Sequence, residues 1–363
     1  ALQANTTAGT NTAIGKDAMF SNTTGYGVAL GKGALYAQTT GVSNTAIGYQ
    51  TLTACTSSNN TAVGDSALGA NTTGANNTAV GKSALTVNTT GIENTAMGYQ
   101  ALDANTTGVG NVAIGYNCMS GNTTASNNVA MGSSTLPICT TGFDNTCIGV
   151  SAGISLTTGD NNLFLGHDAG RSGSPGGLIN TANNQIVLGD ENIANCHIQT
   201  DWSVASDQRD KTDFTALDLG LDFVKALAPV TYKWDKRSKY GDKEAVDYDL
   251  DTITHDGTHK EDWLDIGFKA QEVETLEISS GYNKGNRTNL TTTLSDDGTQ
   301  YGIQYSKFVP ILVKAVQELS EKVETLTLHS SVLEQEAGYH LDNIILDGTN
   351  GSSANAGDDI LLG

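Results

Sequence analysis

The run Ser-Asp-Gln-Arg-Asp-Lys at residues 206–211 contains a serine and a lysine five positions apart. A serine hydroxyl becomes an effective nucleophile when a neighbouring base takes its proton. A lysine amine can be that base once burial or a nearby cation lowers its pKa. Ser206 and Lys211 are residue types that could react together in this way. They lie where a long repeat array ends, and this position suggests a chain that cuts itself between its two halves.

The spacing also limits the local backbone around these residues. Five positions along an α-helix turn two side chains about 140° apart. We therefore expect Ser206 in extended chain or at an N-cap, with Lys211 reaching back from the first turn and backbone N–H groups there holding the oxyanion. Arg209 would be either the cation beside Lys211 or the partner of Asp207 or Asp210 in an ion pair. Alternatively, Ser206 and Asp207 only cap a helix and Lys211 is solvated.

Upstream of this run, the chain is an array of repeats. Eleven copies of a phrase seen as NTAIG, NTAVG or NTAMG follow one another every 16 or 17 residues, and the last interval of 23 contains an insertion at 171–180. The chain begins within a unit, so we expect it to be a fragment of a longer protein. The closing glycines are Gly15, Gly31, Gly48, Gly64, Gly81, Gly98, Gly115, Gly132, Gly149, Gly166 and Gly189.

A unit of this length suits one rung of a β-solenoid or β-roll with two short strands, because helical-hairpin repeats need roughly 30 residues or more. Strand alternation places Thr12 and Ile14 on one face and Ala13 on the other. The recurring Ala-Leu pair supplies further apolar side chains in each unit. The glycine after the first strand and the Asn-Thr-Thr-Gly segment are typical of turns. Stacking should also align a ladder of asparagines: Asn44, Asn60, Asn77, Asn94 and Asn111.

Each rung has only about three apolar side chains, so a single stack would have a thin core. We therefore expect several chains to associate, with an independent monomeric solenoid as the alternative. The NTAIG phrase resembles the head repeats of trimeric autotransporter adhesins, which form trimeric left-handed β-rolls. A threonine column on a flat face also leaves open a solenoid that binds ice or another surface; it consists of Thr45, Thr61, Thr78 and Thr95.

The composition excludes several classes of function. The net charge is −20, with 4 basic and 9 acidic residues in 1–200 and 15 basic and 30 acidic residues in 201–363. An acidic chain without a basic stripe argues against nucleic-acid binding, and no apolar run is long enough for membrane insertion. We expect no cofactor and no metal. The five cysteines lack CxxC spacing and are expected to be free, packed thiols: Cys55, Cys118, Cys139, Cys147 and Cys196.

The half after residue 201 has the pattern of an ordinary α+β domain. Apolar residues from Leu217 to Ala228 recur at helical spacing, Pro229 ends that helix, and residues 230–234 read as a strand. The polar stretch 235–262 is expected to be an exposed insertion. Residues 265–274 predict a strand followed by a helix, and residues 279–300 predict a loop or hairpin.

The last long element shows a heptad pattern. Apolar residues alternate steps of three and four, which is an a/d seam, and Pro310 stands where a first-turn proline is tolerated. We expect a short parallel coiled coil, although the seam could instead pack on its own domain. The polar tail 337–363 suggests no chemistry. The seam positions are Val309, Leu312, Val316, Leu319, Val323, Leu326, Ser330 and Leu333.

These elements together resemble a known family. The order of Ser206-Asp207-x-Arg209-x-Lys211, a helix, PVTYKW, GFKAQEVE and a terminal coiled coil is similar to the C-terminal intramolecular chaperone domain of phage tailspikes and tail fibres, over roughly 201–335. The resemblance implies self-cleavage by a Ser–Lys dyad. Ser206 would be the nucleophile, Lys211 the base, and Ala205–Ser206 the scissile bond, with Asp207 and Arg209 as parts of the site.

The sequence therefore predicts a mainly β protein in three parts. Residues 1–200 form a trimeric β-roll or β-solenoid shaft, 201–336 an α+β chaperone domain ending in a trimeric coiled coil, and 337–363 a polar tail. The expected protein is a virion fibre, assembled as a homotrimer in the host cytoplasm, that binds a host cell-surface receptor or glycan. Its chaperone would align the shaft and then be released by the cut. A trimeric autotransporter-like adhesin on a bacterial surface is the alternative.

Overall fold

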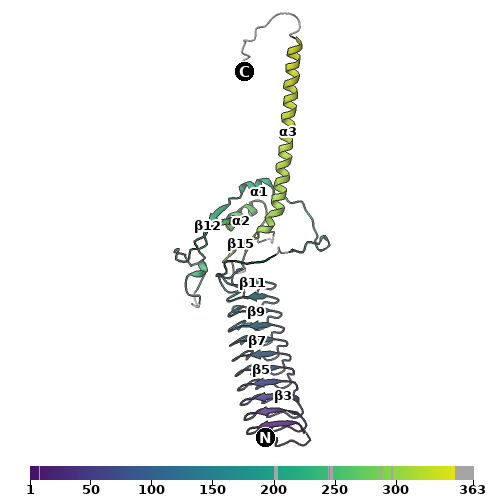
Figure 1. The fold of residues 1–363 in the computed structure, drawn as a ribbon, viewed down its shortest axis with the longest axis vertical. Coiled ribbons are helices and arrows are strands. Elements are labelled where there is room, and N and C mark those ends of the chain that lie inside the picture. Colours follow the sequence, from purple (N-terminus) through teal and green to yellow (C-terminus); the bar gives the residue numbers. More distant parts are fainter. Residues whose placement is uncertain are drawn as a thin grey trace. The chain divides into compact units, whose positions relative to one another are not determined.

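A computed structural model shows a mainly β chain, in which a β-solenoid precedes a helical C-terminal region (Figure 1). Two compact units are present. The first consists of residues 1–203, 231–266 and 293–302, and the second of residues 204–230, 267–292 and those from 303 onward. The structure describes residues 1–7, 9–199, 203–243, 245, 248–283, 285, 288–295 and 297–347.

The solenoid has one strand in each rung, and eleven strands form a single parallel sheet in chain order. The strand register places equivalent residues of neighbouring rungs side by side, as in the pairing of Thr61 with Thr78 and of Ala62 with Ala79. The Ala-Leu segment forms a turn, so our expectation of two strands per rung was wrong. The strands are β1 (Asn11–Ile14), β2 (Tyr26–Leu30), β3 (Val42–Ile47), β4 (Thr61–Val63), β5 (Thr78–Val80), β6 (Thr95–Met97), β7 (Val112–Ile114), β8 (Val129–Met131), β9 (Thr146–Ile148), β10 (Leu163–Leu165) and β11 (Ile186–Leu188).

Backbone conformation explains two recurring residues of the unit. Gly64 closes its strand at φ +132°, and a Cβ there would lie 2.5 Å from the carbonyl oxygen of Gly81 in the next rung, so only glycine fits. The leucine of the Ala-Leu turn is left-handed as well, with φ 51° at Leu85. Leucine disfavours this conformation, but Leu85 is fully buried in the stack. Packing between rungs therefore overrides the local preference.

The interior of the shaft is lined by alanine, leucine and asparagine. Ala62 and Ala79 on the strands and Leu85 in the turn are fully buried. The predicted asparagine ladder is present: the amide of Asn94 donates to Asn77 Oδ1 at 3.2 Å and to a carbonyl oxygen. A second ladder comes from the Asn-Thr-Thr triplets and consists of Asn71, Asn88 and Asn105, with Nδ2–Oδ1 distances of 2.8 Å.

The other face of the sheet points outward and carries a continuous line of apolar side chains, one from the last residue of each strand. We call it the apolar column. Several of its members are exposed, including Ile14 at 60% and Met97 at 43%. An exposed apolar line of this length is uncommon on a monomeric protein. Its members are Ile14, Leu30, Ile47, Val63, Val80, Met97, Ile114, Met131, Ile148, Leu165 and Leu188.

Two later segments of the chain belong to the same unit as the shaft. Strand β12 (Val230–Tyr232) pairs with β13 (Asp265–Gly267), and β14 (Thr292–Leu294) pairs with β15 (Tyr301–Ile303). The polar stretch between β12 and β13 contains the 3-10 helix η2 (Arg237–Lys239). It is not uniformly exposed as we expected, because Ser238 and Leu250 are buried within it.

The second unit is built around three helices. They are α1 (Leu221–Ala226), α2 (Ala270–Ser279) and α3 (Phe308–Asp347), with the 3-10 helix η3 (Tyr305–Lys307) before α3. The first helix is shorter than its apolar pattern predicted, and the predicted strand-to-helix order of β13 and α2 is confirmed. The core of this unit is formed by Leu219, Phe223, Val273, Phe308 and Ile311.

Helix α3 uses one face for its own domain and leaves the heptad seam open. Phe308, Ile311 and Ala315 are buried, whereas the seam residues Leu319 and Leu326 are 49% and 69% exposed. The seam therefore does not pack on its own domain, and a coiled-coil ending stays a prediction. The helix continues to Asp347, and the rest of the tail lies outside the described residues.

All five cysteines are free, as expected, but they are not all packed. Cys196 is exposed, whereas the four cysteines of the repeats are buried: Cys55, Cys118, Cys139 and Cys147. Burial raises the pKa of the Cys118 thiol to about 12 and that of Cys139 to about 11. These buried thiols are therefore protonated at neutral pH.

Candidate functional site

The side chains of Ser206 and Lys211 meet in the second unit. Lys211 Nζ lies 2.5 Å from Ser206 Oγ and 3.5 Å from the Ser206 carbonyl oxygen. Ser206 lies in irregular chain directly before the single turn of η1 (Gln208–Asp210), and Lys211 ends that turn in an extended conformation. The short turn reverses the chain, which allows a lysine five positions away to reach back to the serine.

Asp207 organises this turn. Its carboxylate is the N-cap of η1 and accepts from the Arg209 backbone N–H at 2.9 Å. The Arg209 guanidinium donates to both carboxylate oxygens, through Nε at 3.0 Å and through a terminal nitrogen at 2.5 Å. The side-chain hydrogen bond from Arg209 lowers the pKa of Asp207. Of the alternatives open to Arg209, the structure shows the ion pair with Asp207.

Two features expected of a working site are not complete in one chain. Ser206 and Lys211 are exposed, so nothing in the described chain desolvates the amine. The N–H groups of Arg209, Asp210 and Lys211 donate to Asp207 and Gln208, so these three groups do not form a helix-start oxyanion hole. The roles of these residues in catalysis stay predictions.

Three glutamates that the sequence did not single out hold segments of the chain together, two in the second unit and one at the end of the shaft. Glu318 of α3 accepts from the Leu221 N–H at the start of α1 at 2.7 Å, and a Cβ on Gly220 would lie 2.4 Å from that carboxylate. Glu277 of α2 is fully buried and accepts from the backbone and hydroxyl of Thr291. Glu191 is buried at the end of the shaft. Isolated glutamates carry no spacing signal, so no sequence pattern indicates these contacts.

With this geometry established, comparison with known proteins identifies one part of the chain. Residues 206–280 match the family described as chaperone of endosialidase. The match begins at Ser206 and includes Lys211 and the AQEV segment of α2. No curated protein and no solved structure matches the chain. A chaperone of endosialidase domain behind a β-solenoid fits a phage tail fibre or tailspike with a C-terminal chaperone.

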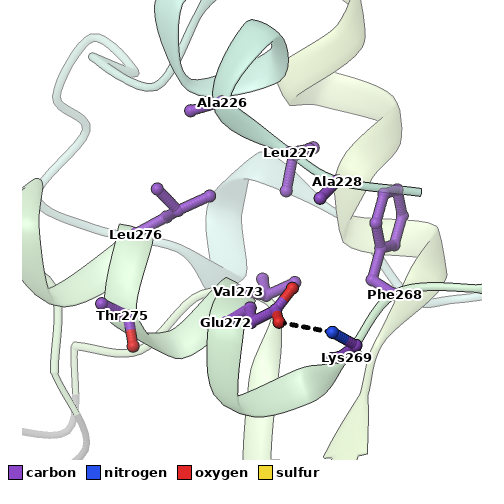
Figure 2. Close-up of a pocket in the computed structure, with 9 residues that line it drawn as sticks. All are labelled: Ala226, Leu227, Ala228, Phe268, Lys269, Glu272, Val273, Thr275 and Leu276. Atoms are coloured by element: carbon purple, nitrogen blue, oxygen red, sulfur yellow. Dashed lines mark hydrogen bonds and ion pairs between the residues drawn. The ribbon is translucent and has the colours of Figure 1, made fainter. Parts of the chain in front are cut away.

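Residues within the part of the chain that matches this family line a pocket of about 200 Å³. Figure 2 shows it between the end of α1 and one face of α2, with an ion pair of 2.7 Å between Lys269 and Glu272 at its edge. The pocket does not include Ser206 or Lys211. Its lining is Ala226, Leu227, Ala228, Phe268, Lys269, Glu272, Val273, Thr275 and Leu276.

The described residues contain no group of three or more His, Cys, Asp or Glu side chains arranged to hold a metal ion. None of the described helices combines the length and the apolar character that crossing a bilayer requires.

Proposed function

We propose that this protein is part of a virion tail fibre or tailspike and that its chaperone domain cuts the chain between Ala205 and Ser206. The observation that carries the proposal is the 2.5 Å approach of Lys211 Nζ to Ser206 Oγ at the first residue of the chaperone of endosialidase match. The match favours this proposal over an autotransporter-like adhesin. A solenoid of ice-binding type would need no such domain.

The proposed reaction is an acyl shift followed by hydrolysis. The neutral amine of Lys211 takes the proton of Ser206 Oγ as that oxygen attacks the carbonyl carbon of Ala205. The new C–O bond forms, the C–N bond between Ala205 and Ser206 breaks, and the Lys211 ammonium gives its proton to the departing nitrogen. Water then hydrolyses the ester, which leaves a carboxylate on Ala205 and restores the Ser206 hydroxyl. The reaction is a single turnover on the chain's own backbone.

Self-association as a homotrimer is the second part of the proposal, and two exposed apolar surfaces support it. One is the seam of α3, in which Leu326 is 69% exposed, and the other is the apolar column of the shaft. Aromatic side chains stack in the same rung-to-rung manner, as for Tyr99 and Tyr116, whose ring centroids are 5.5 Å apart. Burial of both surfaces between copies would remove a large apolar area from water.

Trimerisation would also explain why the protein has a chaperone domain and why cleavage would follow assembly. Nearly identical rungs can pair in shifted registers, and a C-terminal domain that aligns three chains would select one register. Because the dyad is exposed in one chain, we propose that neighbouring copies cover it and exclude water from it. Cleavage would then follow assembly. The mature shaft would bind a host cell-surface receptor or glycan.

The test is cell-free synthesis of the full chain followed over time on denaturing gels. We expect two fragments for the wild type and a single full-length band for Ser206→Ala and for Lys211→Ala. Lys211→Arg keeps the positive charge but is a far weaker base, so it should also stay intact. Ser206→Thr keeps a hydroxyl and should be cut slowly.

Lys225→Ala is the matched control, because Lys225 is an exposed lysine of the same unit that faces Asp222. It should be cut as fast as the wild type. A wild-type chain that stays intact under conditions in which it trimerises would overturn the proposed cleavage. Cutting of Lys211→Ala at the wild-type rate would remove the lysine from the mechanism.

A further inference from the structure

The first compact unit contains residues from both sides of the proposed scissile bond. That unit contains residues 1–203, which precede the bond, and residues 231–266 and 293–302, which follow it. We call these two later segments the clamp. Contacts between the clamp and the shaft therefore join the two fragments that a cut after Ala205 would produce.

The first group of contacts surrounds Glu191, which follows the last strand of the shaft and whose side chain is only 7% exposed. Lys243 of the clamp forms an ion pair with its carboxylate, and Lys236 donates from Nζ to its backbone carbonyl oxygen at 2.7 Å. In the opposite direction, Arg171 of the shaft donates to the Lys243 carbonyl oxygen at 3.4 Å. The buried carboxylate of Glu191 is thus paired with Lys243 of the clamp, and its backbone carbonyl oxygen is bound by Lys236.

A second group of contacts lies at the insertion of residues 171–180, in the last interval of the repeat. The carboxylate of Asp297 accepts from the Leu178 backbone N–H at 2.9 Å. Ser238 of the clamp is buried and packs so closely on Gly173 that a Cβ on this glycine would lie 2.5 Å from the Ser238 Cβ. The two clamp segments also hold each other, because Arg237 donates to the Thr299 carbonyl oxygen at 2.7 Å.

The distribution of charge agrees with this arrangement. Three of the nine acidic residues in 1–200 lie in the last two rungs: Asp168, Asp190 and Glu191. The clamp is acidic overall, yet it turns the basic side chains Lys236 and Lys243 to that end of the shaft. A terminal rung of a solenoid also leaves an unpaired strand edge, which repeat proteins cover with a cap.

We propose that the clamp is a non-covalent lock, centred on Glu191, that keeps the C-terminal fragment bound to the end of the shaft after the Ala205–Ser206 bond is cut. This inference rests on the proposed cleavage for its biological setting. Cutting removes one peptide bond in an exposed segment and none of the contacts described above. The sequence led us to expect release on cleavage; the contacts indicate that a separate event must open the clamp.

The test separates cutting from retention. The full chain is analysed on a denaturing gel and by native size-exclusion chromatography, at low salt and at about 1 M salt, where charge interactions are screened within about 3 Å. We expect two bands on the gel and one native peak containing both fragments at low salt. The double variant Lys236→Glu with Lys243→Glu should be cut equally but lose at least tenfold in the fraction that co-elutes.

The matched control is Lys260→Glu, an equal charge change at an exposed lysine of the same segment. It should retain both fragments as the wild type does. Pairing Glu191→Lys with Lys243→Glu restores an opposite-charge pair and should recover retention. Separation of the wild-type fragments at low salt would overturn the lock, and retention in the double charge-reversal variant would overturn its assignment to Glu191.

A second chain keeps the test independent of self-cleavage. It carries Ser206→Ala and a site for an added protease inserted after Ala205, where the chain is exposed. If the wild type is not cut on its own, the proposed function fails, and this chain still measures retention after the added protease acts. If the protease-cut fragments separate at low salt, the lock fails whether or not the dyad is active.

Discussion

At the scale of single residues, carboxylates position much of the C-terminal half. Asp207 caps the turn that brings Lys211 to Ser206, and Glu318 accepts from the first N–H of α1. The backbone hydrogen bond from Leu221 lowers the pKa of Glu318. These carboxylates accept hydrogen bonds more strongly when ionised than when protonated, so the local structure depends on their charge.

Asp297 gives this dependence a direction that can be tested. Burial raises the pKa of Asp297, but hydrogen bonds from Ser295, Leu178 and Thr299 outweigh it, so the pKa lies below its usual value. A lowered pKa in the folded state stabilises the clamp above about pH 3.9, the ordinary aspartate value, and this contribution is lost as pH falls through the folded pKa. We expect cut fragments that co-elute at neutral pH to separate progressively below about pH 4.

The comparison chain for this pH series is Asp297→Asn, which retains a side-chain acceptor without the titrating group. Its fragments should co-elute less than the wild type at neutral pH and change less between neutral and acidic pH. An Asp297→Asn chain with the full wild-type pH response would assign the titration to other groups.

At the scale of elements, α3 divides its surface between two tasks. The face with Phe308 and Ile311 is buried in the core of the second unit, whereas the seam with Leu319 and Leu326 is open to solvent. An open apolar seam at heptad spacing is the pattern of a helix that packs on copies of itself. The element therefore links the folded domain to the proposed trimer.

The role of the seam in association can be tested with two leucines that differ in their position on the helix but have nearly the same exposure. Leu326 lies on the seam and is 69% exposed, and Leu328 lies off the seam and is 67% exposed. We expect Leu326→Asp to reduce the trimer to lower-mass species in light scattering after size exclusion, because a charge in the seam would be buried unpaired. Leu328→Asp should stay trimeric. Equal masses for the two variants would contradict a role for the seam.

The asparagine ladders are the corresponding element of the shaft. Asn94 accepts from the Asn111 backbone N–H at 3.0 Å and donates to the Gly108 carbonyl oxygen at 2.8 Å, within a fully buried column. Its side chain thus satisfies backbone groups that water cannot reach. Each rung depends on its neighbour for these bonds.

Replacement of one ladder residue should therefore weaken the shaft. We expect Asn94→Ala to lower the free energy of unfolding by about 1–3 kcal/mol, the cost of leaving buried polar groups unpaired. Guanidinium titration of the full chain measures the change, with Thr90→Ala on the exposed surface as the control. A midpoint for Asn94→Ala equal to that of the control would show that water or a neighbouring group replaces the amide.

At the scale of the whole molecule, the shaft is a stack in which each rung pairs only with the rungs beside it. Such a stack gains its stability from interfaces between neighbours. Closure of the apolar column between copies would make opening of any rung slow, which is stability of a kinetic kind. The cysteines report on this opening, because four lie in the core at different heights and one is exposed.

Thiol labelling of the full chain should resolve these two classes. We expect a maleimide to label Cys196 rapidly and to leave Cys55, Cys118, Cys139 and Cys147 unlabelled under native conditions, as mass spectrometry of the digested protein would show. Burial blocks access to all four thiols, and at Cys118 it also raises the thiol pKa and so keeps the reactive thiolate scarce. Addition of denaturant should expose all four. Rapid native labelling of Cys118 would show that the shaft opens locally without denaturant.

Much of the fold was predictable because its signals are local and repeated. The closing glycine predicts one rung every 16 or 17 residues, and the alternation around Ala62 predicts which side chains share a face of the strand. Pro229 and the heptads predict where helices end and begin. For Ser206 and Lys211, the sequence led us to expect that the lysine reaches back to the serine, with a solvated lysine as the alternative, and the two side chains do meet. These properties depend on neighbours within a few residues.

The remaining features depend on contacts between distant parts of the chain. The sequence alone determined the repeat length, the order of elements and the serine–lysine spacing, because turn chemistry and periodicity act locally. Only the tertiary structure decided that Leu85 adopts a left-handed conformation, that α3 buries Ile311 while its seam stays open, and that Lys243 pairs with Glu191. Each of these features is set by packing or by charge pairing between segments that are far apart in the sequence. Contacts of this kind produce no repeating pattern in the sequence.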